Sequence, residues 1–522
     1  MNGVIINMKI MNRMNSKKTL PFIIAITLTL TLFLGLTAPA GAAQIIGQLD
    51  FSANPADDSG DGWEWVQLTK TLTLNDLDLA YNGGGGCSTQ PAILLPVDSI
   101  LQLTGNSIVN NTNGGCINVP SGNLTIQGNG TISIDSANSY GIFVYNDVSI
   151  SDSTTVSINS EYRGLDADNV TISSGTVTIN STDSYGIYSY ESVIIINGTV
   201  SITSHYEGIY ADEAVTISGG TVTINSTDDC GIHTDSGPVE ISGGTVSITA
   251  DEEGIYAEDD SVTISGGTVS IISTDNYGID ADEAVTISGG TVSITAKYEG
   301  ICADEVTISG GTVSITSNND WGIHADNFTI SGGMVSITAD YEGIYADNVT
   351  ISGGYGQIKT LDSTGDIWAV VSYDDLNITS GIPVKGWDGT GYTIPASVAY
   401  IYNDEHGNDI NTFVSGGNIA LTNIQFGNPP SGGGGGGTGQ ATIVEGNKPV
   451  NTPPAAPQPE TNDSNTNTNQ TANNNSQNPD TRSDNNVATG GGSNTTMWII
   501  IGIMAAVLIL GGGFFLYSKY GK

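Results

Sequence analysis

Short runs in which apolar and polar residues alternate recur along most of the chain. In the unit that begins at Gly208, the runs are 209–211, 215–217 and 222–224, and Gly, Asn or Asp residues separate them. Alternation with a period of two and many β-branched residues is typical of half-buried strands. The Ser-Gly-Gly breaks leave too little room for an amphipathic helix. The pattern therefore predicts three short strands per unit.

The unit itself repeats about every 22 residues. A fixed period of this size indicates a solenoid, because a single unit buries its apolar face only against its neighbours. We expect an all-β, right-handed parallel β-helix of about 13 coils, roughly 60 Å long at about 4.8 Å per coil. Less regular units begin at Ala92, Cys116 and Asp366, and a marker glycine opens each of the others: Gly141, Gly164, Gly186, Gly208, Gly231, Gly254, Gly278, Gly300, Gly322 and Gly343.

The ends of the repeat differ from its middle. A terminal coil would expose an open sheet edge, so we expect an N-terminal cap with the first strands over 44–91, the β-helix over 92–380 and a C-terminal cap over 381–427. The residues expected to supply bulk to the N-terminal cap are Trp63, Trp65, Val66 and Leu68.

Four further segments predict where the protein lies. Residues 1–43 have the basic, apolar and small-residue regions of a secretory signal peptide. Residues 428–496 are a low-complexity linker, and 497–517 are an uncharged stretch long enough for one transmembrane helix. The two lysines of the 518–522 tail predict a cytoplasmic C-terminus. We expect a single-pass cell-membrane protein with an extracellular ectodomain.

The charge narrows the class of partner. The formal net charge is −41, and all 54 acidic residues lie between residues 44 and 496 with only seven Lys and Arg, which gives this part −47. Phosphate binding needs the opposite sign, so nucleic acid is excluded as a partner. Solubility or adaptation to salt would also explain a negative surface.

Part of the acidic charge forms a column, four residues after each marker glycine. Like charges stacked about 4.8 Å apart repel one another, which suggests a compensating cation, and calcium outside a cell accepts six to eight oxygens. The alternative is that the side chains splay into water and hold counterions loosely. The predicted calcium ligands are Asp212, Asp235, Glu258, Asp282, Asp304, Asp326 and Asp347.

Aromatic residues form further columns, two residues after the marker glycine and just before it. Sugar rings stack on aromatic side chains, and a polymer with a regular repeat could engage several coils at once. The alternative is that the rings fill corners of the coil. The predicted carbohydrate-binding residues are Tyr188, Tyr210, Tyr256, Tyr345, Tyr185, Tyr277 and Trp321; a related set, two residues before the glycine, is Tyr162, Tyr206, Tyr298 and Tyr341.

Catalytic chemistry has one candidate. Arg163, close to Asp166 and Asp168 in the sequence, could act as the base of a polysaccharide lyase, although one arginine beside acids is more often an ion pair. The uniform repeat argues against a specialised cleft, and we predict no catalytic residues. Cys87 and Cys116 occupy matching points of adjacent coils, where a disulfide is an open alternative.

Two motifs resemble a known family. The opening Gly62-Trp63-Glu-Trp65, followed by Thr-Lys-Thr-Leu-Thr-Leu at 69–74 and the repeated Gly-Ile-Tyr-Ala and Val-Thr-Ile-Ser-Gly-Gly-Thr-Val-Ser-Ile, resembles bacterial and archaeal carbohydrate-binding β-helix proteins. Such proteins are pectate-lyase-like in fold and non-catalytic. The resemblance covers roughly residues 45–400 and implies calcium at the corners of the rod and a polysaccharide partner of the cellulose or polyuronate class.

The sequence thus favours a cell-surface-anchored, non-catalytic carbohydrate-binding protein with bound calcium. The first alternative is a calcium-stiffened adhesin or surface-layer stalk that binds protein or cells. The second is a pectate-lyase-like polysaccharide lyase that uses Arg163.

Overall fold

The computed structural model describes residues 44–83, 90–361, 367–387, 391–402, 409–415, 419–429 and 447–449. The predicted signal peptide, transmembrane helix and tail, nearly all of the linker, and Cys87 lie outside these residues. Within the described residues every regular element is a strand. No helix among them is long and apolar enough to cross a membrane.

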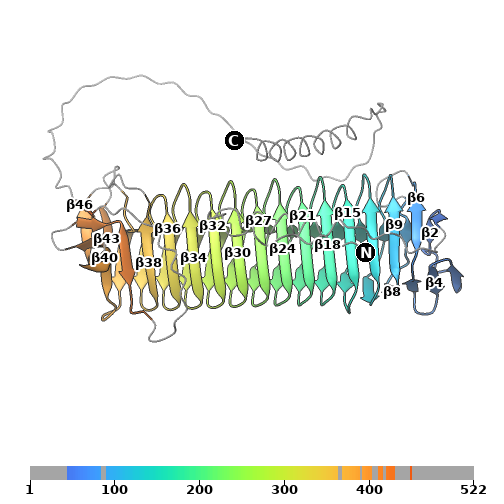
Figure 1. The fold of residues 1–522 in the computed structure, drawn as a ribbon, viewed down its shortest axis with the longest axis horizontal. Helices are drawn as coiled ribbons and strands as arrows, with labels where there is room; N and C mark the ends of the chain where they lie inside the picture. Colours follow the sequence, from blue (N-terminus) through green and yellow to red (C-terminus); the bar gives the residue numbers. More distant parts are fainter. Residues whose placement is uncertain are drawn as a thin grey trace, which may run out of the picture. The chain divides into compact units, whose positions relative to one another are not determined.

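The strands stack coil upon coil into a parallel β-solenoid of about 12 turns, near the predicted 13 (Figure 1). The coil of Gly208 contains β22 (Ile209–Ala211), β23 (Val215–Ile217) and β24 (Thr221–Ser226), close to the predicted runs. Third strands of consecutive coils pair with one another, as β24 does with β27 (Thr245–Ala250), and form one sheet. First and second strands make up the other sheet. The predicted all-β parallel solenoid is confirmed.

The prediction of three separate strands per coil fails toward the C-terminal end. The first two strands are joined in β31 (Ile279–Ile287), β33 (Ile301–Ile308), β35 (Ile323–Ile330), β37 (Ile344–Ile351) and β39 (Val370–Ile378). In β33, β35 and β37 only two residues separate the two runs, and Asn327 of this short connection pairs in register with Glu305 and Asn348. Consecutive connections of only two residues let the ladder continue through the corner, whereas the equal three-residue connections at 190–192 and 212–214 leave the strands separate.

The core is a set of columns that repeat one residue type. Ile209, Ile232 and Ile255 pair in register on successive coils, and each is fully buried. The marker glycine beside this column is required by close packing. A Cβ on Gly208 would lie 2.7 Å from the carbonyl oxygen of Gly231 and closer still to the Cγ2 of Ile224. No side chain fits at such distances, so the sequence repeats glycine wherever the coil passes this corner.

The N-terminal end is formed by three antiparallel strands, β3 (Asp58–Gly60), β4 (Trp63–Val66) and β5 (Thr71–Leu74). Trp65 is fully buried, and its ring stacks on Phe51 at 4.8 Å between centroids. The expectation for Leu68 is wrong, because its side chain is 92% exposed. Leu68 lies in the turn between β4 and β5, outside the alternating strand positions that point inward.

The C-terminal end also changes from parallel to antiparallel pairing. Strand β45 (Asn423–Phe426) runs antiparallel along β38 (Tyr355–Thr360), the last parallel third strand, and Phe426 is fully buried. Strand β43 (Asp409–Ser415) pairs antiparallel with β42 (Ser397–Tyr402) and meets β39 at Ser372. Antiparallel strands thus occur at both ends, although at the N-terminal end they lie beside the short parallel strands β1 (Ile45–Ile46) and β2 (Leu49–Asp50).

Candidate functional site

The outward residues at the first strands form one continuous surface, called here the outer face. Its central column lies two residues after the marker glycine and pairs in register from Asp166 to Tyr345. A second column lies just before the glycine, where each carbonyl oxygen accepts a hydrogen bond from the marker glycine of the preceding coil, as Glu207 does from Gly186 at 3.1 Å. The predicted alignment of the aromatic columns is therefore present in the backbone.

Sequence reasoning missed the acidic half of the second column. Between the coils that hold Tyr185, Tyr277 and Trp321, the position before the glycine holds mostly glutamate. The signal was visible in the Tyr-Glu-Gly triplets at 206–208, 298–300 and 341–343. The glutamates of this column are Glu207, Glu253, Glu299 and Glu342; the first three are at most 9% exposed.

The front of the outer face is an aromatic stack closed by a cation, called here the cation-capped stretch. The Arg163 guanidinium lies 3.4 Å from the centre of the Tyr188 ring. On its other side, Tyr188 stacks on Tyr210 with centroids 4.6 Å apart and planes at 19°. Tyr185 packs edge-on against both tyrosines, at 5.1 and 5.7 Å. Because a cation covers one face of Tyr188 and a ring the other, only its edge faces a ligand.

Arg163 is held in place by an ion pair. Its Nη1 donates to Asp166 Oδ2 at 2.9 Å and to the Tyr190 hydroxyl at 3.1 Å, and the Asp166 side chain is 1% exposed. Burial alone would lower the pKa of Arg163, but the Asp166 carboxylate outweighs it and raises the pKa above its usual value. Burial also raises the pKa of Asp166, which Arg163 only partly offsets. An arginine that holds its proton this firmly is poorly suited to act as the base of a lyase.

The middle of the outer face has buried acids and no such cation, and is called here the buried-acid stretch. It contains the buried Glu253 and Glu299 and the half-buried Asp280, and no ion pair among the described residues involves them. Burial raises the pKa of Glu299 to about 7. Burial, followed by the charge of Glu253, raises the pKa of Asp280 to about 6. Burial also raises the pKa of Cys302 to about 12, so this thiol is not an activated nucleophile.

A second aromatic group follows toward the C-terminal end. Trp321 stacks on Tyr345 with centroids 4.2 Å apart and planes at 15°. The Trp321 Nε1 donates to Glu342 Oε2 at 3.0 Å, and the Tyr373 hydroxyl donates to the Tyr345 hydroxyl at 2.7 Å. The rings thus lie against one another and are tied by polar contacts.

The predicted carbohydrate-binding residues are only half-exposed. Tyr185, Tyr188, Tyr210, Tyr256, Tyr277, Trp321 and Tyr345 are all of intermediate burial. The related set two residues before the glycine reaches further into solvent, at 36–47% exposure for Tyr162, Tyr206, Tyr298 and Tyr341. The most solvent-exposed aromatic residues of the outer face are therefore tyrosines that the predicted site did not include.

The predicted calcium ligands converge at one place among the described residues. Asp235 and Glu258 lie with His233 so that one ligand atom of each is within 4.8 Å of the others. Asp212 is half-buried, and the remaining members of the column are exposed: Asp282, Asp304, Asp326 and Asp347. None of these five belongs to a group of three such ligands in the described part of the chain. The set with His233 includes an imidazole nitrogen, whereas calcium prefers oxygen ligands.

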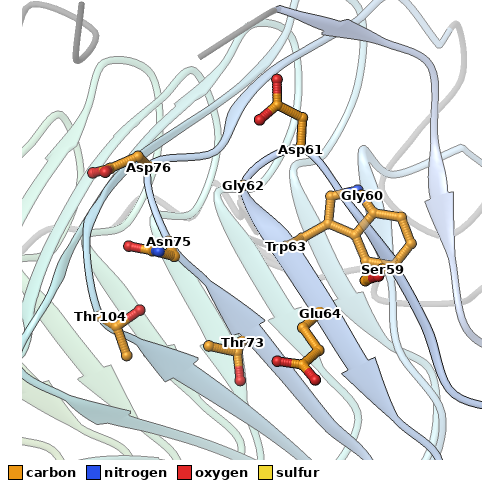
Figure 2. A pocket seen from close by; sticks show the side chains of 10 residues that line it. All are labelled: Ser59, Gly60, Asp61, Gly62, Trp63, Glu64, Thr73, Asn75, Asp76 and Thr104. Atoms are coloured by element: carbon orange, nitrogen blue, oxygen red, sulfur yellow. The ribbon is translucent and has the colours of Figure 1, made fainter. Parts of the chain in front are cut away.

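A hollow of about 670 Å³ lies at the N-terminal end, apart from the outer face (Figure 2). It is lined by the ring of Trp63 and by the polar side chains of Glu64, Asn75 and Asp76. The other lining residues are Ser59, Gly60, Asp61, Gly62, Thr73 and Thr104. The Asp76 carboxylate accepts a hydrogen bond from the Asn106 backbone nitrogen at 2.9 Å. Part of this polar lining is therefore engaged in holding the turn.

Comparison with known proteins gives one family and no individual relative. Searches of curated proteins and of solved structures returned no match. The family described as "Carbohydrate-binding domain-containing protein" matches residues 173–321 and 267–423. These ranges contain all seven predicted carbohydrate-binding residues and most of the outer face. The match and the parallel solenoid together support a carbohydrate-binding role for this chain.

Proposed function

We propose that the outer face binds an extended polysaccharide without cleaving it. The observation that carries this proposal is the two runs of half-exposed rings beside carboxylates, within residues that match a carbohydrate-binding family. Tyr256 ends the first run of rings, because Asp280 follows it in the column, so one side of its ring meets no further ring of that column. The protruding Tyr206 and Tyr298 add edges on which sugar C–H faces can pack.

The polymer is of the cellulose or polyuronate class. Glycan hydroxyls would donate hydrogen bonds to the half-buried carboxylates of Asp212 and Asp235. A polyuronate would need calcium between its own carboxylates and those of the acidic column. Exposed Asp282, Asp304 and Asp326 offer only oxygens and suit calcium in this bridging role. Calcium would supply charge neutralisation there.

The proposal also includes the location. A signal peptide over 1–43 and a membrane helix over 497–517 would present the rod outside the cell, on a linker formed by 428–496. A surface-bound rod with many similar coils gains from repeated weak contacts with one polymer chain, because each later contact is intramolecular.

One observation favours the alternative of an adhesin or stalk. Tyr188 and Tyr345 each lie against ring neighbours on more than one side, at 4.2–5.2 Å. Such packing stiffens the rod whether or not a glycan binds. In that case the aromatic columns are structural, and the partner is a protein or another cell.

The test is retention of the purified protein on insoluble cellulose and on immobilised polygalacturonate, with calcium and with EDTA. We expect retention by the wild type, and its loss in the triple variant Tyr206→Ala, Tyr256→Ala, Tyr298→Ala. The matched control is Tyr145→Ala, a more exposed tyrosine (56%) at an earlier coil outside the matched residues.

Three other outcomes would each redirect the proposal. Absence of retention on both polymers, with a melting temperature raised by calcium, would favour the stalk. Retention independent of the three tyrosines would move the glycan site off the outer face. Release of unsaturated products from polygalacturonate, abolished by Arg163→Lys, would reinstate the lyase.

A further inference from the structure

One cluster on the outer face differs from the rest in containing a histidine. His233 projects from β25 (Ile232–Thr234), and its side chain is 15% exposed. Its Nε2 atom lies 3.5 Å from Asp235 Oδ1 and 3.6 Å from Glu258 Oε2. Nε2 is buried and has no hydrogen-bond partner. This buried nitrogen faces two carboxylates at ion-pair distance but donates a hydrogen bond to neither.

The separation of these atoms matches a metal site. Zinc bonds of about 2.0–2.2 Å to nitrogen and oxygen, in tetrahedral geometry, put two ligand atoms about 3.4 Å apart. The two Nε2 to oxygen distances of 3.5 and 3.6 Å are close to that value. They are longer than a charge-assisted hydrogen bond, which would draw an imidazolium to about 2.7–2.9 Å from the oxygen.

Neighbouring residues orient two of the three ligands. The other ring nitrogen, Nδ1, lies 3.3 Å from Glu207 Oε1, and the Glu207 side chain is 8% exposed. A ligating histidine usually donates its second N–H to a carboxylate in this way, which leaves Nε2 free for the metal. Asp235 is held likewise, because the Tyr210 hydroxyl donates to its Oδ2 at 2.6 Å while Oδ1 faces His233.

We infer that His233, Asp235 and Glu258 bind a divalent transition metal of the zinc class through Nε2, Oδ1 and Oε2. Three protein ligands leave one tetrahedral position open, and Asp235 and Glu258, at 43% and 51% exposure, place that position toward solvent. Glu207 is a positioning residue. The site is distinct from the proposed calcium bridging, which uses oxygens alone and different coils.

The test is metal binding to the purified full-length protein, freed of any histidine tag, stripped with chelator and titrated with Zn²⁺ and with Co²⁺. We expect one tight site per chain, with the visible absorption bands of tetrahedral Co²⁺, and no displacement by a large excess of Ca²⁺. His233→Tyr should lower the affinity at least 100-fold. Tyrosine fits this position, because Tyr210 and Tyr256 hold it in the adjacent coils.

Further variants separate this site from its surroundings. Glu207→Gln leaves all three ligands in place and should weaken binding about 10–100-fold, as loss of an orienting partner does. His324→Tyr changes the other histidine of the same column and should have no effect. Cys230→Ser removes the central ligand of a neighbouring group, formed with Asp229 and Glu252, and should also have no effect.

Two results would overturn the inference. Equal metal binding by wild type and His233→Tyr would mean that the acidic surface holds an adventitious ion only. An octahedral Co²⁺ spectrum together with displacement by Ca²⁺ would mean an all-oxygen site that excludes His233.

Discussion

The cation-capped stretch and the buried-acid stretch lie on the same sheet and differ in how buried charge is compensated. In the first, Arg163 neutralises Asp166 and lies against the Tyr188 ring. In the second, the buried Glu299 and the half-buried Asp280 have no ion-pair partner among the described residues, and their pKa values rise instead. Because the first strands of both stretches pair in one register, the difference arises from the side chains of two columns. Different stretches of one solenoid face can therefore have different electrostatic properties.

The largest expected effect comes from removing the cation. Arg163→Met leaves the Asp166 charge buried and unpaired, and we expect the free energy of unfolding to fall by about 3–5 kcal/mol, measured by denaturant titration. The double variant with Asp166→Tyr, the residue that the next coil holds at this position, should recover most of the loss. Equal loss in single and double variants would show that the ring contact of Arg163, not its charge, stabilises the stretch.

The opposite effect is expected in the buried-acid stretch. Unfolding returns Glu299 to its usual pKa of 4.5, whereas the fold raises it to about 7. At pH 8 the fold thus holds an unfavourable charge, and Glu299→Gln should stabilise the protein by about 3 kcal/mol. The gain should vanish at pH 4, where the glutamate is protonated in both states. Exposed Glu305, changed to Gln, is the control and should show no such gain.

The same acids predict the pH dependence of the wild type. Between about pH 4 and pH 7 the folded chain retains protons on Asp280 and Glu299 that the unfolded chain has released. Stability contributed by such groups falls as the pH rises through this window. Melting temperatures should therefore decrease from pH 5 to pH 7.5, and by less in the double variant Asp280→Asn, Glu299→Gln. An equal decrease in the variant would assign the pH dependence to other groups.

A smaller difference should separate two tyrosines of the face. Tyr188 has ring partners and Arg163 against it, whereas Tyr277 has no ring partner among the described residues. Replacement by Leu should cost about 1 kcal/mol more at Tyr188 than at Tyr277, because it also removes ring stacking and the cation–π contact. Equal losses of unfolding free energy, measured by denaturant titration, would mean that each tyrosine stabilises the fold through its buried area alone.

The smallest effect concerns Lys297, a cation of the middle coils. It pairs with Asp275 on the surface and lies over the Tyr298 ring at 5.1 Å. An exposed pair of this kind contributes little, so Lys297→Ala should leave the melting temperature unchanged. A clear loss would mean that Lys297 offsets the buried acids after all.

The interior could be predicted from the sequence because burial there leaves few choices. Period-two runs and the column at Ile209 and Ile255 fix which side of each strand faces inward. The outer face was predicted only as columns. Sequence spacing indicated which residues align, but not that Tyr188 lies between Arg163 and Tyr210, nor that His233 joins Asp235 and Glu258. Those contacts depend on side-chain direction across coils of different length.

The near-identity of the coils also affects how the chain folds. A coil stacked on the wrong neighbour would recover nearly the same interior columns, so the core discriminates weakly between correct and shifted stacks. Singular contacts must supply the discrimination, and the buried Trp65 against Phe51 occurs at one end only. We therefore expect the N-terminal strands β3 to β5 to set the stacking register. If assembly begins there, each later strand has only one correct neighbour on which to stack.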